Sequence, residues 1–384
     1  MKLRGGTTVL LPEHHLSDRY QFVNISGSKS VLALVISGVP QGSVLGPILF
    51  LIYINDLENC LVSSIADSFA DDTRLGKQIT CQDDVIKLQE DLDNVVLWSK
   101  ANNMKLHENK FELLTYRGSV TVNKAALSQC AFSNEFLQYR TSDNGILYPS
   151  SFVKDLGVYA TPDLMSTIHV NKMVESANRM ANWVLSVFMV RTAEVMLNLF
   201  KLMARSMLEY CCPVWDPSTI PNIQKVESTQ RSFTQYIKGC KGLTYWEWLK
   251  VLDILSLQRR RERYIIIHIW KIIHGQSPND VSLIYYEHPR LGMRCKIPPL
   301  PNAAARSAKT AFDQSFAVKG PQLWNILPPE INLMKTLDSF KRKLTHFIKD
   351  RFPDKPPVHG YACQNSNSLL EWAKLPAGRL QQIA

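Results

Sequence analysis

Hydrophobic and polar residues follow two different periods along this chain, and the period changes near residue 160. Up to that point most apolar residues stand in short runs or alternate with polar ones, as strands require. We expect strands over Gln21–Ile25, Ser30–Val35, Ile65–Ala70, Thr73–Leu75, Phe111–Tyr116 and Ser151–Tyr159. The third and fourth of these are close enough in sequence to form a hairpin with Asp71 and Asp72 at its tip.

Two helices are expected among these strands. From Cys81 to Lys100 the apolar residues recur at helical spacing and the charged residues fall on the other side, which predicts an amphipathic helix packed on a sheet. Ile48–Leu57 is almost wholly apolar and follows a loop punctuated by glycine and proline. We therefore expect it to form a buried helix.

Helical periodicity dominates after about Thr161. Four long helices are expected over residues 166–188, 192–211, 219–237 and 256–274. Residues 276–305 are rich in proline and show little periodicity. The apolar spacing over Leu337–Phe352 predicts one more short helix. The tail from Pro353 is expected to be loosely ordered, with a helical turn at Leu369–Leu375. The pattern as a whole predicts an α+β segment followed by an all-helical segment.

Composition narrows the range of partners and compartments. The chain has 384 residues, 45% of them hydrophobic, and a formal net charge of +10, which favours a polyanionic partner. Its eight cysteines form no C-x-x-C pair and no zinc-knuckle spacing, so we expect buried thiols in a reducing compartment. The longest apolar run, Val44 to Ile54, is too short to span a bilayer. With no signal-peptide pattern in residues 1–20, the protein is expected to be intracellular and soluble, in nucleus or cytoplasm.

The main candidate for chemistry is the acidic pair in Phe69-Ala70-Asp71-Asp72. Two neighbouring carboxylates on a tight hairpin are hard oxygen ligands suited to divalent metal and nucleotide phosphates. The alternative interpretation of such a pair is a solvated turn. The first interpretation is favoured by a glycine- and proline-rich run about thirty residues upstream. This run is Ser37-Gly38-Val39-Pro40-Gln41-Gly42-Ser43-Val44-Leu45-Gly46-Pro47.

Taken together, Ser37–Leu57 and Phe69–Thr73 resemble the palm of reverse transcriptases from non-LTR (LINE-type, jockey-like) retrotransposons. The resemblance implies an N-terminally truncated RNA-directed DNA polymerase that uses an RNA template, a DNA primer and deoxynucleoside triphosphates. It implies an antiparallel palm sheet with packed helices, then a helical thumb. The corresponding domains are 1–36 (a remnant before the palm loop), 37–160 (a partial palm), 161–275 (the thumb) and 276–384 (a C-terminal region with a Pro-rich linker, a short helix and a flexible tail).

The same resemblance assigns roles around the acidic pair. Asp71 would be the main ligand and Asp72 a peripheral ligand of Mg²⁺ or Mn²⁺ in two-metal nucleotidyl transfer. The loop residues Gln41 and Gly42 would contact the incoming nucleotide and the template base. Three further residues complete this set: Phe69, which keeps the family's aromatic packing, Ala70, whose small side chain lets the primer approach, and Lys110, near the triphosphate. An exposed lysine without function is the alternative for Lys110.

Further matches extend the resemblance toward the carboxyl end. Val153–Val158 resembles the primer-grip strand pair, which assigns Leu156 and Gly157 to the grip. His169–Phe188 resembles the first thumb helix, with Lys172 and Arg179 on its polar side. Leu208-Glu209-Tyr210 with Pro213-Val214-Trp215 is another family signature. From its charge, the cluster Arg259, Arg260 and Arg261 is expected to contact nucleic-acid backbone, with a solvated helix face as the alternative.

One part of the expected metal site is missing from the sequence. The palm of this family needs a third carboxylate on a strand before the Ser37–Pro47 run, and residues 1–36 contain no such motif; the fingers are absent as well. We therefore expect the chain alone to be inactive as a polymerase. Two hypotheses follow: a reverse transcriptase fragment that is catalytic in its parent element, or a non-catalytic nucleic-acid-binding remnant. A reading frame from a decayed element, never stably folded, is a third.

Overall fold

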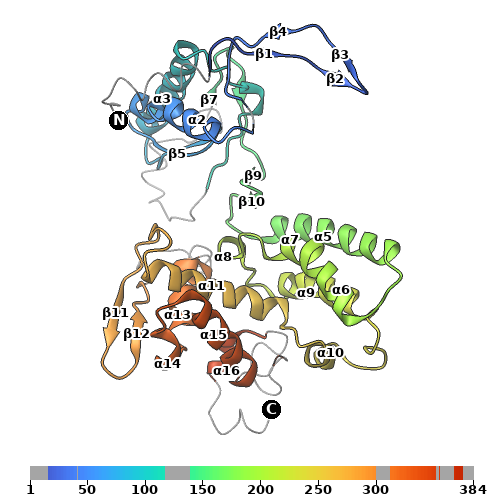
Figure 1. Ribbon diagram of the computed structural model, residues 1–384. Helices are drawn as coiled ribbons and strands as arrows, with labels where there is room; N and C mark the ends of the chain where they lie inside the picture. Colours follow the sequence, from blue (N-terminus) through green and yellow to red (C-terminus); the bar gives the residue numbers. More distant parts are fainter. Residues whose placement is uncertain are drawn as a thin grey trace. The chain divides into compact units, whose positions relative to one another are not determined.

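The computed structural model describes residues 16–40, 42–116, 139–299, 312–351, 354 and 367–374. The chain divides into two compact units, residues 1–112 with 123–148 and residues 113–122 with 149–384. The described residues combine helices with six two-stranded antiparallel sheets, which confirms an α+β composition (Figure 1).

Two strand pairs form a long, narrow ribbon in the first unit (Figure 1). β1 (Tyr20–Gln21) pairs with β4 (Ala33–Leu34), and β2 (Asn24–Ile25) pairs with β3 (Ser28–Lys29) around a turn whose Gly27 has φ +91°. The expected strands Gln21–Ile25 and Ser30–Val35 are thus present but interrupted. The interruption lies where the Val23 N–H donates to the Ser30 side chain at 2.9 Å instead of a ladder carbonyl.

The remainder of the first unit contains helices, short hairpins and one small core. The elements among the described residues are α2 (Gly46–Ile54), the 3₁₀ turn η1 (Leu57–Cys60), β5 (Ile65–Phe69), β6 (Asp72–Gly76), α3 (Gln82–Ala101), the 3₁₀ turn η2 (Glu108–Lys110), β7 (Tyr139–Arg140) and β8 (Ile146–Leu147). Ile54, Leu57 and Val95 form the core, with the partly buried Trp98 against it. The amphipathic helix α3 is confirmed, because Val85, Val95 and Val96 are all buried.

Two sequence-based expectations for the chain up to Tyr116 were wrong. The apolar helix α2 is not buried: Ile48, Leu51 and Ile52 are each more than half exposed, and only Gly46 and Ile54 are buried. Because α2 has apolar residues on every side, its contacts with one small core leave most of them in solvent. Phe111–Tyr116 forms no strand either, and only Leu113 makes a single bridge, to Pro149.

The second unit consists mainly of helices (Figure 1). Its described residues include two hydrophobic core clusters. The first core lies among β9 (Val153–Asp155), β10 (Val158–Ala160), α5 (Thr167–Val187), α6 (Ala193–Leu199), the π-helical η3 (Phe200–Arg205), α7 (Ser206–Glu209), α8 (Cys212–Trp215), α9 (Ile220–Thr234) and α10 (Tyr245–Val251). The helices expected over residues 166–188, 192–211 and 219–237 are confirmed. Ser151–Tyr159 is a hairpin rather than one strand, because the chain reverses at Leu156 and Gly157.

The second core surrounds the long helix α11 (Leu257–Ile273). The other described elements around it are β11 (Tyr285–His288), β12 (Gly292–Cys295), α13 (Phe316–Trp324), α14 (Pro329–Asn332), α15 (Leu337–Arg351) and α16 (Leu369–Ala373). The short helix and the terminal helical turn are confirmed. The expectation of a loosely ordered tail was wrong for residues 367–374, since Trp372 is fully buried in this core. Most of the remaining tail lies outside the described residues.

Candidate functional site: an acidic hairpin and a basic helical unit

The acidic pair lies at the tip of a tight two-residue hairpin. β5 and β6 pair from Ile65 with Gly76 to Phe69 with Asp72, which leaves Ala70 and Asp71 as the turn. Ala70 has φ +53°, so the first residue of the turn is left-handed, a conformation that glycine adopts most easily. The tip is therefore one residue earlier than the sequence indicated: Asp71 is in the turn, and Asp72 opens β6.

The two carboxylates are exposed, and within the described residues they have no hydrogen bond or ion pair to another side chain. Asp72 faces the same side of the hairpin as Phe69, its cross-strand partner, which is 66% exposed. The opposite side packs Leu75 against the small core. Because Asp71 is in the turn, the alternation of strand residues does not force the two carboxylates apart.

A buried carboxylate on α3 holds the segment that leads into this hairpin. Asp91 is fully buried and accepts the backbone N–H groups of Val62 at 2.7 Å and Ser64 at 2.7 Å, as well as the hydroxyl of Ser63 at 2.8 Å. Burial alone would raise its pKa, but these hydrogen bonds lower it to about 2. Sequence reasoning placed Asp91 on the polar face of its helix and missed this role.

The structure places the other residues of the first unit without bringing them into contact with the acidic pair. Gly42 is exposed with φ +84°, a conformation that favours glycine, while Gln41 lies outside the described residues. Lys110 is exposed at the end of η2, with its backbone N–H bonded to His107. The roles assigned to these residues stay predictions.

The expected primer-grip residues form the turn of the β9–β10 hairpin in the second unit. Leu156 has φ +44° and Gly157 φ +86°, so both central residues are left-handed. The Tyr210 hydroxyl donates to the Leu156 carbonyl at 2.9 Å, and its ring lies so close that a Cβ on Gly157 would approach Cε1 at 3.2 Å. Tyr210 belongs to the Leu208-Glu209-Tyr210 signature, which was noted from sequence without a role for the tyrosine.

The exposed face of α5 carries Lys172 and Arg179. The buried side of the helix packs Val170, Ala177 and Val184 into the first core of the unit, each at 0% exposure. This geometry agrees with the expectation that both basic residues point to solvent. Contact with nucleic acid remains a prediction for them.

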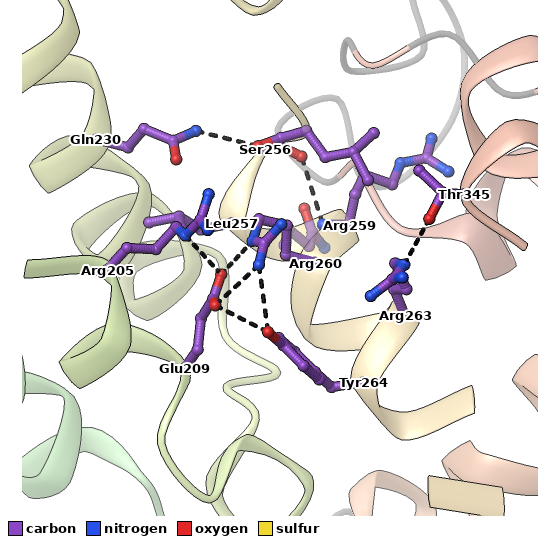
Figure 2. A network of polar contacts seen from close by, with 12 residues as sticks. Arg205, Glu209, Gln230, Ser256, Leu257, Arg259, Arg260, Arg263, Tyr264 and Thr345 are labelled. Carbon is purple, nitrogen blue, oxygen red and sulfur yellow. Dashed lines mark hydrogen bonds and ion pairs between the residues drawn. The ribbon is translucent and has the colours of Figure 1, made fainter. Parts of the chain in front are cut away.

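The arginine cluster on α11 differs from the expected surface patch. Arg259 and Arg261 are fully buried, and Arg261 Nε donates to Asp216 Oδ1 at 2.6 Å. Arg260 Nη2 donates to Glu209 Oε2 at 3.0 Å, and the Arg260 side chain is only 17% exposed (Figure 2). The expectation of direct backbone contact was therefore wrong for Arg259 and Arg261, because distant acidic and amide groups hold them in the core.

Two buried glutamates that sequence reasoning did not single out hold the two ends of this region: Glu227 on α9 and Glu262 on α11. Glu227 accepts the N–H groups of Leu257 at 3.1 Å and Gln258 at 3.2 Å, so it caps the amino end of α11. Glu262 accepts the Leu369 N–H at 2.7 Å and thereby anchors the carboxyl-terminal helix. Their sequence signal is weak because each partner lies far away along the chain.

The described residues do not supply a complete metal site. Within them no three His, Cys, Asp or Glu side chains gather closely enough to hold a metal ion. Asp71 and Asp72 are hard oxygen donors free to bind Mg²⁺ or Mn²⁺, yet they are only two. The hairpin therefore fits part of a two-metal ligand set. No helix in the described part of the chain is both long and apolar enough to cross a membrane.

Comparison with known proteins gives this geometry a context. A family model described as reverse transcriptase (RNA-dependent DNA polymerase) matches residues 7–158. The chain is 23% identical over 244 residues to a probable RNA-directed DNA polymerase from transposon X-element of Drosophila melanogaster, covering 60% of this chain and 25% of that protein. It is 24% identical over 234 residues to an RNA-directed DNA polymerase from mobile element jockey of Drosophila funebris, covering 56% of this chain and 23% of that protein.

A shorter match of higher identity reaches a probable RNA-directed DNA polymerase from transposon BS of Drosophila melanogaster. It is 33% identical over 104 residues, which cover 25% of this chain and 12% of that protein. The chain thus spans about a quarter of the length of the X-element and jockey relatives. No solved structure matches it.

Proposed function

We propose that this chain, a jockey-like member of the reverse transcriptases of non-LTR retrotransposons, provides a metal-binding hairpin and a nucleic-acid-holding helical unit for RNA-directed DNA synthesis. The observation that carries the proposal is the β5–β6 tip, where Asp71 and Asp72 are exposed and have no protein partner within the described residues. Since the chain spans about a quarter of its relatives, their full reaction belongs to the proposal as well.

The residues of the hairpin have separable tasks in this proposal. Asp71, in the turn, is the main metal ligand, and Asp72, on β6, is the peripheral one. Divalent ions, when bound, would supply charge stabilisation for phosphoryl transfer. Phe69 and Ala70 border the primer strand, and Gln41, Gly42 and Lys110 contact the nucleotide. Because the described residues offer no third carboxylate, we derive no catalytic step for this chain alone.

We further propose that residues 37–160 form a partial palm and residues 161–275 a thumb. Two features of the second unit support contact with nucleic acid. Lys172 and Arg179 lie on the exposed face of α5, where they can approach phosphates. The Leu156-Gly157 turn is fixed by Tyr210, as a grip on a primer end would need.

A non-catalytic nucleic-acid-binding remnant is the second candidate function. The observation that favours it is that no three potential metal ligands gather in the described part of the chain. The two candidates share the basic helical unit and differ in the hairpin. Metal binding at Asp71 therefore separates them.

Titration with Mn²⁺, followed by the electron paramagnetic resonance of the free ion, tests the first proposal. We expect weak binding that Asp71→Asn reduces at least about fivefold, because a carboxylate is exchanged for a neutral ligand. Asp67→Asn is the matched control, since Asp67 is an exposed carboxylate on the same hairpin. Equal binding by the wild-type chain and the Asp71→Asn variant would contradict the assigned role and favour the remnant.

A further inference from the structure

The arginines around Glu209 carry more positive charge than the protein neutralises. Arg205 and Arg260 both approach the Glu209 carboxylate, and Arg263 lies one turn further along α11 (Figure 2). Tyr264, a neutral phenol, donates to Glu209 Oε2 at 3.2 Å. Within the described residues no second carboxylate pairs with these guanidiniums. Three positive charges therefore share one negative charge.

Arg205 is the least satisfied member of this cluster. Its side chain is only 15% exposed, and its Nε lies 3.6 Å from Glu209 Oε1, beyond a good hydrogen bond. The same Nε is buried and has no hydrogen-bond partner. Burial and then repulsion from Arg260 lower its pKa. A guanidinium held in this way is costly for the folded protein unless an anion reaches it.

The fold brings the three arginines together from separate elements. Arg205 ends the π-helical turn η3 in the continuous helix that runs from α6 to α7, and π-helical turns are frequent at functional sites. Arg260 and Arg263 are three residues apart on α11 and so share a face. Arg263 donates to Thr345 Oγ1 at 2.8 Å and to the Lys341 carbonyl at 3.3 Å, both neutral acceptors that leave its charge uncompensated.

We propose that Arg205, Arg260 and Arg263 bind one phosphate of a nucleic-acid backbone. The guanidinium fork matches phosphate oxygens in a bidentate geometry that favours arginine over lysine. Side-chain exposures of 15% for Arg205 and 17% for Arg260 leave a narrow approach, which suits a single phosphate group rather than a broad protein surface. The choice of nucleic acid over other phosphates rests on the proposed function.

Fluorescence anisotropy with labelled oligo(dT), in EDTA and over a range of salt concentrations, tests this site without any metal. We expect Arg205→Gln to weaken binding about tenfold and to lower the slope of log K against log salt by about one, the loss of one phosphate contact. Arg205→Lys should retain part of the affinity. Lys238→Gln, the same charge change at an exposed residue, should leave the slope as in the wild-type chain.

Thermal unfolding without nucleic acid separates binding from a structural role. Removing Arg205 relieves its repulsion with Arg260, so Arg205→Gln should not lower the Tm, whereas Glu209→Gln should lower it. A large fall in Tm for Arg205→Gln would mark Arg205 as structural and overturn the proposal.

Thermal unfolding with added inorganic phosphate tests whether the site binds a small anion instead of nucleic acid. If it stabilises the wild-type chain but not Arg205→Gln, while oligo(dT) binds both equally, the site takes a small anion and the proposal fails. Because EDTA removes metal, a failed Mn²⁺ titration at Asp71 leaves these results unaffected.

Discussion

At the scale of one residue, His169 shows how burial lowers the pKa of a side chain. Its side chain is 4% exposed, its Nδ1 accepts the Tyr159 N–H at 3.3 Å, and its Nε2 is buried without a partner. Its ring lies 4.9 Å from that of Trp215. Burial lowers the pKa of His169 from 6.5 to about 4, so the folded protein keeps the ring neutral.

This histidine should make stability depend on pH between about 6.5 and 4. In that range of pH the unfolded chain binds the proton and the folded protein does not, so the free energy of unfolding falls as the pH falls. Above pH 6.5 the histidine is neutral in both states, and stability no longer depends on its titration. The loss is on the order of 3 kcal/mol at most, from about 1.4 kcal/mol per pKa unit. Urea unfolding at several pH values measures it. His169→Phe should reduce the slope, and His346→Gln, at an exposed histidine, should not.

Gly157 is a position where the backbone conformation and a close neighbour both favour glycine. Gly157→Ala would place a methyl group at φ +86° and 3.2 Å from the Tyr210 ring. We expect a loss of about 1–2 kcal/mol from the backbone alone, and more from the contact. Gly239→Ala is the control, since it has φ +95° and no heavy atom within 4 Å of its Cβ. Equal losses for the two variants in urea unfolding would show that the tyrosine contact contributes nothing.

At the scale of elements, the hairpin that carries the acidic pair depends on α3. Asp91→Asn should destabilise the segment before β5, because one amide oxygen cannot replace a carboxylate that accepts three backbone N–H groups. We expect a loss of about 3 kcal/mol, as for a buried hydrogen-bonded charge, and faster hydrogen exchange across β5 and β6. Asp93→Asn, at an exposed position on the same helix, should change neither. Unchanged exchange in the Asp91→Asn variant would contradict the supporting role.

How well the sequence predicted an element depended on whether its partners are local. The apolar periodicity of α3 and α15 predicted both helices, because their own faces determine what is buried. α2 has no polar face, so its pattern could not show that most of it would be exposed. The β11–β12 hairpin was missed, since the proline-rich composition around it hides a strand signal.

The candidate site follows the same rule. The acidic pair could be identified from its own residues, whereas the arginine cluster could not. Arg260 pairs with a glutamate 51 positions away and Arg261 with an aspartate 45 positions away. A run of positive charge in sequence looks identical whether it meets solvent or distant carboxylates. Burial of Arg259 and Arg261 therefore became visible only in the fold.

At the scale of the whole molecule, similarity to reverse transcriptases and a complete catalytic site are separate matters. The reverse transcriptase family model matches residues 7–158, and the matches to jockey and X-element relatives extend over a larger part of the chain. The described residues nevertheless supply two candidate carboxylate ligands where the proposed reaction uses three. Loss of one ligand from a two-metal site should slow the reaction by roughly 10³-fold or more.

Primer extension on a homopolymer RNA template, with Mg²⁺ or Mn²⁺ and the full 384-residue chain, tests this account most directly. We expect no more product from the wild-type chain than from Asp71→Asn, while both bind the primer-template with the same salt dependence. Robust synthesis by the wild-type chain that Asp71→Asn abolishes would contradict the account, because it would show a complete metal site in this polypeptide.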